Sequence, residues 1–284
     1  MKNREKKYFL MVLPGLAGMI AVYGLPYLKM FLTSLQESAS QRVFVGLRNY
    51  AELFQNRAFL RALGNTAVIC VLGTALILPL SILLALLLLR SGRLQSFLRT
   101  SFILPFFVPA ACVVMVWRVL FDQNGAINSL LRQLGGSGAD WLGSGWSKLA
   151  VLLMYLWRNI GLNVVLFTGA MAGLPTERVD VARIEGAGRV QVFFLVTLRH
   201  LAPAVVFAAV LSVMNSFKVF REIYLLTGDY PPESMYLLGH FLNNMLRQMN
   251  YPRMSAGAIV YTLFAAGLMS VLYFLEKRAG KDET

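Results

Sequence analysis

The chain has 284 residues, of which 57% are hydrophobic and only 14% are charged, and its mean hydropathy is +0.60. Ordinary soluble domains carry roughly 25% charged residues, so this composition excludes a water-soluble fold. The net charge of +13 comes from basic residues scattered between apolar runs, without the basic stripe and interleaved aromatics typical of a nucleic-acid-binding protein.

The first apolar run follows a basic stretch from Met1 to Lys7, a pattern shared by signal peptides and first membrane spans. The apolar core of a signal peptide is about 7 to 15 residues long, whereas this run continues past Pro26 to about Leu32. No convincing small-residue cleavage site accompanies it. We therefore expect a retained transmembrane helix.

Six apolar runs reach or approach the ~20 residues needed to cross a bilayer. They lie near Tyr8 to Leu32, Asn65 to Leu89, Phe102 to Phe121, Leu149 to Gly173, Leu201 to Leu226 and Ser255 to Leu275. If the N-terminus is cytoplasmic, the inner segments hold fourteen Lys and Arg residues and the outer loops eight. The positive-inside rule then predicts both termini in the cytoplasm. We expect one all-α integral membrane domain over residues 1–284.

The loop between the fourth and fifth spans, residues 174–200, is densely charged. Thr176 is suited to cap a helix from Glu177 to Glu185, and Gly186 to supply the left-handed residue that ends it. A second short helix is expected near Arg189. From composition alone, a plain solvated loop is the favoured alternative to this helix-turn-helix elbow.

The stretch Asp180-Val181-Ala182-Arg183-Ile184-Glu185-Gly186-Ala187, followed by Gln191, Phe193, Leu198 and Pro203, resembles the Glu-Ala-Ala loop of permease subunits of binding-protein-dependent ATP-binding-cassette importers. Other strings match the carbohydrate-uptake branch, with its maltose and glycerol-phosphate type permeases, in order and spacing. They are Val45 to Tyr50, Ala62 to Thr66, Leu104-Pro105, Gly125 to Asn128 and Leu226 to Gly228. Two departures are Asp180-Val181-Ala182 in place of Glu-Ala-Ala, and Arg199 where a Pro often stands.

This resemblance implies the MetI-like permease fold in the bacterial inner membrane, with the elbow as a coupling helix. It implies half of a translocation path for a sugar or oligosaccharide, three protein partners and the lipid bilayer. The partners are a second permease, an ATPase dimer and an extracytoplasmic solute-binding protein. ATP and Mg are expected on the ATPase, because this chain has no Gly-x-x-x-x-Gly-Lys-Ser/Thr string. A non-catalytic subunit without its own cofactor follows. The expected ATPase-coupling residues are Asp180, Val181, Ala182, Arg183, Glu185, Gly186 and Ala187.

Polar side chains within spans four and five are candidates for the substrate path, because such groups are costly when they face lipid. Amides and hydroxyls beside an aromatic ring suit a sugar. Spacings of three or four residues place Asn159 with Asn163, and Ser212 with Asn215 and Ser216, on shared helix faces, and Trp157 is the aromatic residue beside them. The resemblance to the maltose permease implies sugar contacts at Arg158, Asn159, Leu162, Ser212, Asn215, Ser216 and Val219. The alternative role for the polar members of this set is to join helices.

Three charged residues lie near the outer end of span five: Lys218, Arg221 and Glu222. They are expected either to form an ion-pair gate or to extend toward the membrane surface. Because Arg158 lies in the proposed path, the sequence leaves both neutral and anionic sugars open as substrates.

Two other functions are disfavoured. A secondary transporter normally needs coupling carboxylates near the membrane midplane, and Glu222 is the one acidic candidate within the expected spans. A membrane-embedded enzyme would need His200 or His240 as a ligand or base, but the topology places them on opposite sides of the membrane.

Overall fold

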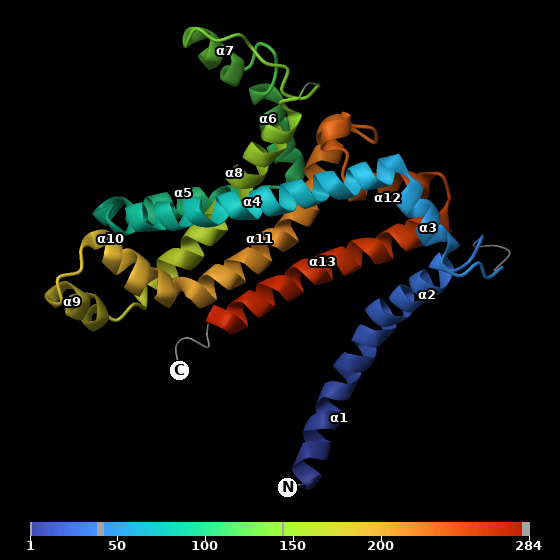
Figure 1. Ribbon diagram of the computed structural model, residues 1–284, viewed down its shortest axis with the longest axis horizontal. Helices are drawn as coiled ribbons and strands as arrows, with labels where there is room; N and C mark the ends of the chain where they lie inside the picture. Colours follow the sequence, from blue (N-terminus) through green and yellow to red (C-terminus); the bar gives the residue numbers. More distant parts are fainter. Residues whose placement is uncertain (1, 39–42, 144, 280–284) are drawn as a thin grey trace. The chain divides into compact units, whose positions relative to one another are not determined.

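The computed structural model describes residues 2–38, 43–143 and 145–279, and side chains within 11–274. This part of the chain is helical, with one isolated antiparallel bridge between Gln36 and Phe44. The helices, labelled in Figure 1, are α1 (Lys2–Met19), α2 (Leu25–Ser34), α3 (Arg48–Gln55), α4 (Arg57–Leu89), α5 (Gln95–Phe107), α6 (Ala110–Leu120), α7 (Ala126–Gln133), α8 (Ser147–Ala172), α9 (Thr176–Ile184), α10 (Arg189–Val192), α11 (Leu198–Thr227), α12 (Leu238–Arg247) and α13 (Tyr251–Ala279). The all-α expectation is confirmed.

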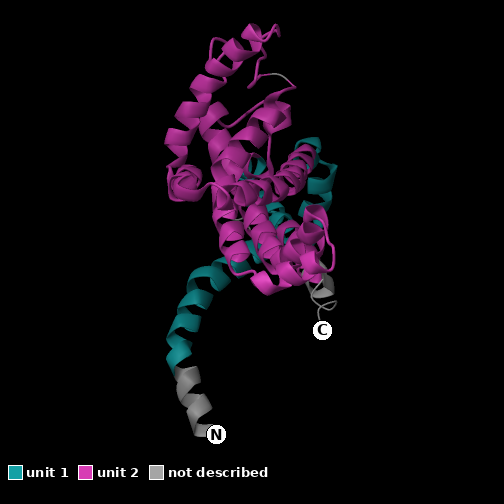
Figure 2. Ribbon diagram, turned by 90° about the vertical axis from the view of Figure 1, so that its left-hand side faces the viewer, with its two compact units in different colours: residues 1–60, 241–263 teal, residues 61–240, 264–284 magenta. Residues whose placement is uncertain are grey.

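Contacts divide the chain into two compact units, coloured in Figure 2. Unit 1 comprises residues 1–60 and 241–263, and unit 2 comprises residues 61–240 and 264–284. Because α4, α12 and α13 each continue from one unit into the other, the boundary separates groups of packed side chains and does not mark a linker.

Five segments among the described residues are long and apolar enough to cross a membrane. They are Met11–Ser34, Arg57–Leu89, Ser147–Ala172, Arg189–Thr227 and Tyr251–Phe274. Each overlaps one of the expected spans, although the second segment begins at Arg57 and the fourth at Arg189. The fourth is longer than expected because a π-helical turn over Phe193–Thr197 joins α10 to α11 without a break.

The span expected from Phe102 to Phe121 is divided into α5 and α6, which are bent by 102°. The bend lies at Val108 and Pro109. Proline has no N–H to continue a helix and disfavours the helical conformation of the residue before it, and Val108 is extended, with φ −66° and ψ 132°. Counting apolar residues along the chain does not detect this break.

The core of unit 2 lies around α8. One buried cluster brings Ile77 of α4, Trp117 of α6 and Ile223 of α11 against Tyr155. The helix α5 approaches α8 so closely that a Cβ atom on Gly161 would lie 1.7 Å from the carbonyl oxygen of Phe102. A glycine is therefore required at this crossing, as at many close contacts between membrane helices.

Two buried asparagines in unit 2 join loops to helices. Asn65 of α4 donates to the carbonyls of Glu233 and Tyr236, at 2.8 and 3.0 Å. Asn128 donates to the carbonyls of Asp122 and Ala139, and its Oδ1 accepts from the Ala139 N–H and the Trp141 indole. These bonds tie the Gly-rich segment after α6 to the buried Asn128.

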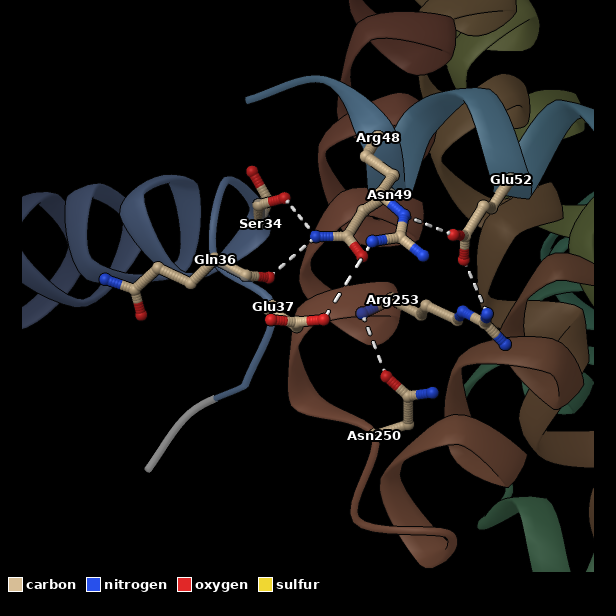
Figure 3. A network of polar contacts seen from close by, with 8 residues as sticks. All are labelled: Ser34, Gln36, Glu37, Arg48, Asn49, Glu52, Asn250 and Arg253. Atoms are coloured by element: carbon tan, nitrogen blue, oxygen red, sulfur yellow. Dashed lines mark hydrogen bonds and ion pairs between the residues drawn. The ribbon is translucent and has the colours of Figure 1, made fainter. Parts of the chain in front are cut away.

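A polar network of the same kind organises unit 1 (Figure 3). Asn49 of α3 donates to the carbonyls of Ser34 and Gln36, both at 2.8 Å. Glu52, one turn along α3, pairs with Arg48 at 2.9 Å and with Arg253 of α13. These contacts fix α3 against both the end of α2 and the beginning of α13.

The Glu52 ion pairs predict a pH-dependent stability. Hydrogen bonds from Arg253 and Arg48 hold the pKa of Glu52 in the folded protein below its usual 4.5. The ion pairs therefore stabilise the fold fully above pH 4.5. This stabilisation is lost as the pH falls through the lowered pKa of the folded state. In detergent at pH 7, E52Q is expected to lower the melting temperature by about 1–3 °C, as for exposed ion pairs. Acidification toward pH 3 should bring the melting curves of the wild type and E52Q together. A gap that is constant over this range would contradict the assignment.

Candidate functional site

Unit 2 contains a cavity of about 350 Å³ between α8 and α11, with Phe106 of α5 also in its wall. Its walls are Phe106, Met154, Tyr155, Arg158, Asn159, Asn215, Lys218, Val219, Arg221 and Glu222. The volume lies in the range of small-molecule sites, and the walls combine aromatic and apolar surface with a few polar groups, as such sites do. This cavity is the candidate substrate site.

An ion pair lies in the wall of this cavity. Arg158 Nη1 of α8 is 2.8 Å from Glu222 Oε1 of α11, and the two side chains are 14% and 5% exposed. Arg158 Nη2 also donates to the carbonyl of Val108, at 3.2 Å. The break between α5 and α6 releases that carbonyl from helical hydrogen bonding, so one guanidinium satisfies both the helix break and the buried carboxylate.

Other polar groups connect α8 to α11. The Tyr155 hydroxyl donates to the carbonyl of Ser212 at 2.8 Å, and the Asn163 amide donates to the Ser212 hydroxyl at 3.0 Å. A further bond lies within α11 itself, where Lys218 Nζ donates to Asn215 Oδ1 at 3.0 Å. The cavity therefore lies beside a helix pair whose relative position is fixed by hydrogen bonds.

The structure places only part of the expected substrate path at the cavity. Four of its residues line the cavity: Arg158, Asn159, Asn215 and Val219. The other five, which do not line it, are Trp157, Leu162, Asn163, Ser212 and Ser216. Of these, Asn163 and Ser212 bond to each other across the helix pair, as in a helix-joining role, and the Ser216 hydroxyl bonds to the Val213 carbonyl within α11. Trp157 makes an edge contact with the ring of Trp117.

All three charged residues expected near the outer end of span five line the cavity. The ion pair between Glu222 and Arg158 was not expected, because the two residues are far apart in the sequence. Sequence reasoning also missed Phe106, Met154 and Tyr155. Aromatic and apolar residues within a span resemble core residues, and no sequence signal separates those that face a cavity.

The elbow after α8 has the expected form. Helix α9 ends in a Schellman motif: Ala187 N–H bonds to the Ala182 carbonyl, Gly186 N–H to the Arg183 carbonyl, and Gly186 has φ +87°. Helix α10 follows, and the Gln191 side chain accepts a hydrogen bond from the N–H of Gly188. The expected cap at Thr176 is wrong, because Thr176 is the first helical residue and follows Pro175.

Apolar side chains are exposed on this elbow. Ile184 is 86% exposed, Val190 70% and Val181 54%. Asp180 and Arg183 pair at 3.7 Å along the surface of α9. Ile184 and Val190 were not among the expected coupling residues.

The two histidines do not line the cavity. His240 is fully buried, burial lowers its pKa to about 4, and its Nδ1 accepts from the N–H of Leu237. His200 contacts the carbonyl of Ala170 through Nε2. Over the residues that the structure describes, no group of three or more His, Cys, Asp or Glu side chains is placed to hold a metal ion.

The model of a protein family described as "Binding-protein-dependent transport system inner membrane component" matches residues 77–281, including the cavity helices and the elbow. The chain belongs to this family. It is an inner membrane permease component of a transport system.

Relatives of the permease match over most of its length. The probable ABC transporter permease protein YurN of Bacillus subtilis is 28% identical, with 97% of each chain covered. The arabinooligosaccharides transport system permease protein AraP of Halalkalibacterium halodurans is 29% identical, over 76% of this chain and 70% of the relative.

Crystal structures share the fold of the permease. A bacterial ABC transporter that imports the acidic polysaccharide alginate contains a chain with a TM-score of 0.83 and 21% identity, covering 97% of this chain and 96% of that one. A structure of an alginate transporter in complex with its pentasaccharide-bound periplasmic protein matches equally well. The expected MetI-like permease fold is confirmed.

The buried ion pair predicts strong coupling between α8 and α11. R158Q leaves the buried Glu222 with only the more distant Arg221, at 3.6 Å. Loss of one partner from a buried ion pair lowers the free energy of unfolding by about 3–5 kcal/mol. The double variant R158Q/E222Q is expected to recover most of this loss, because no unpaired charge remains. Unfolding of the wild type, R158Q, E222Q and R158Q/E222Q in detergent gives the coupling energy.

A matched control for this cycle is the exposed pair Arg48–Glu52, for which a coupling energy below about 1 kcal/mol is expected. Additive losses at Arg158 and Glu222, with no more coupling than at this exposed pair, would contradict the proposed link between the helices.

Proposed function

We propose that this permease forms half of the path by which a sugar or oligosaccharide crosses the bacterial inner membrane. The observation that carries the proposal is the cavity between α8 and α11, where amide and charged side chains face an apolar and aromatic wall. Sugar hydroxyls need hydrogen-bond donors and acceptors, and sugar rings stack on aromatic faces. AraP is named for arabinooligosaccharides and the structural relative for alginate, which supports a carbohydrate substrate.

Three partners complete the proposed importer. A solute-binding protein delivers the sugar; in support, the related alginate transporter forms a complex with a periplasmic protein that carries an alginate pentasaccharide. A second permease, either a homologue or a copy of this chain, supplies the other half of the path. An ATPase dimer binds ATP and Mg, and drives the cycle through the elbow. Both termini and the elbow are assigned to the cytoplasmic side by the distribution of Lys and Arg.

The proposed coupling residues are the expected set, Asp180, Val181, Ala182, Arg183, Glu185, Gly186 and Ala187. The exposure of Ile184 and Val190 adds these two side chains to the proposal. The Schellman motif makes the turn between α9 and α10 rigid, so closure of the ATPase would move α9, α10 and α11 together. Transmission of this kind is a rigid-body movement. In the cavity, Arg158, Asn159, Asn215 and Val219 are the proposed substrate contacts.

The first test compares two glycines of the elbow in proteoliposomes that contain both permeases, the ATPase and the binding protein. G186S places a side chain at φ +87°, which costs about 1–2 kcal/mol of strain in the turn between α9 and α10. ATP-dependent oligosaccharide uptake is therefore expected to fall, because the elbow no longer holds its native geometry. G188S is the matched control, because Gly188 is extended and serine is favoured at the start of a helix.

G188S is expected to transport like the wild type. Equal uptake by G186S and G188S, at equal membrane levels, would exclude the elbow as the coupling element. Absence of ATP-dependent uptake of any sugar by the wild-type assembly would refute the proposed function itself.

The second test addresses docking of the ATPase. I184D places a charge on the most exposed apolar side chain of the elbow without removing a buried contact. It is expected to lower copurification of the ATPase about tenfold or more, because a charge at the centre of an apolar contact is desolvated without a partner.

The control for I184D is L134D, since Leu134 is 76% exposed and lies in the loop after α7, which is assigned to the opposite side of the membrane. L134D should retain the ATPase. If I184D retains it as well, Ile184 is not part of the docking surface.

A further inference from the structure

The charges around the cavity are unequal in number, and this imbalance bears on the substrate. Three cationic side chains, Arg158, Lys218 and Arg221, line it together with one carboxylate, Glu222. The arrangement of these four groups decides which positive charges are already compensated within the chain.

Glu222 compensates only one of the cations fully. Its Oε1 accepts from Arg158 at 2.8 Å, and the nearest contact of Arg221 is with the same oxygen at 3.6 Å. The other oxygen, Oε2, is buried and has no hydrogen-bond partner among the described residues. Arg158 and Glu222 thus form a closed, nearly buried pair, whereas the guanidinium of Arg221 is 60% exposed.

Lys218 has a neutral partner. Its Nζ donates to Asn215 Oδ1 at 3.0 Å, and within the part of the chain that the structure describes no carboxylate lies within ion-pair distance of it. Lys218 and Arg221 are both on α11, three residues apart and therefore on neighbouring positions of the helix surface. Among the described residues, Lys218 thus has no carboxylate partner, and Arg221 has only a longer contact with a carboxylate that already pairs with Arg158.

From this arrangement we infer that the transported sugar carries an anionic group, a carboxylate, sulfonate or phosphate, that binds between Lys218 and Arg221. The inference rests on the proposed function. Unpaired cations in a membrane are costly, and a passing anion offsets that cost while the site is occupied. An anion would accept charge-assisted hydrogen bonds from both side chains, which are about twice as strong as neutral ones. A neutral sugar gains no such compensation.

The test uses the complete importer in proteoliposomes with a defined mixture of probes. The mixture contains oligosaccharides from digests of neutral and of uronate-containing polysaccharides, part of the acidic digest with its carboxyl groups reduced to alcohols, and sugar phosphates and sulfonates. Mass spectrometry identifies the species that accumulate with ATP. We expect anionic species to accumulate and their carboxyl-reduced counterparts to be excluded. The acidic arms distinguish a carboxylate from a phosphate or a sulfonate.

The double variant K218Q/R221Q keeps hydrogen-bonding groups but removes both charges. It is expected to lower uptake of the anionic species about tenfold or more, as for loss of a charge-assisted hydrogen bond. K148Q is the matched control, because Lys148 is an exposed cation at the start of α8 outside the cavity, and its uptake should equal that of the wild type.

Two results would overturn the inference and leave the proposed function intact. The first is that the wild type accumulates neutral oligosaccharides as fast as acidic ones. The second is that K218Q/R221Q takes up acidic species at the same rate as the wild type. The first would indicate that acidic groups of the second permease balance Lys218 and Arg221. Accumulation of no sugar of any kind would instead refute the proposed function, and the inference with it.

Discussion

The ion pair between Arg158 and Glu222 is the interaction on which the architecture of the cavity depends. A membrane protein must satisfy buried polar groups internally, and the bend between α5 and α6 leaves the Val108 carbonyl without a helical partner. Arg158 meets that requirement and neutralises Glu222 at the same time. One side chain thus joins three elements, and the irregular backbone at Val108 is found beside a cavity, where such backbone is tolerated.

A second constraint explains three of the strings on which the resemblance to carbohydrate permeases rests. Asn49, Asn65 and Asn128 each lie within one of these strings, and each is buried with its amide bonded to main-chain groups of a neighbouring segment. An asparagine side chain offers both donors and an acceptor, so one residue satisfies several loop groups that would otherwise be buried without partners. These strings therefore encode loop attachment.

The elbow and the cavity obtain their rigidity in different ways. The elbow depends on main-chain geometry, since its two capping hydrogen bonds require a left-handed residue at Gly186 and its side chains remain exposed. The cavity depends on side-chain contacts between α8 and α11, together with the close approach of α5 at Gly161. Helix α11 continues from the elbow through the π-helical turn to the cavity wall, so a movement at one end is carried to the other by a continuous element.

The sequence by itself determined the all-α membrane architecture, the position of five helical spans and the form of the elbow. These properties depend on neighbouring residues: the length of an apolar run, and a glycine after a short helix. The break at Pro109 was equally local, but it was missed because hydropathy averages over the proline.

Only the tertiary structure decided which polar residues share the cavity. Asn159 lines it and Asn163 does not, although both lie in the same span, and Glu222 pairs with a residue of another helix. Helix packing sets these outcomes, because the direction of each side chain depends on how α8 and α11 are rotated against each other. Spacing along one chain segment does not contain that rotation.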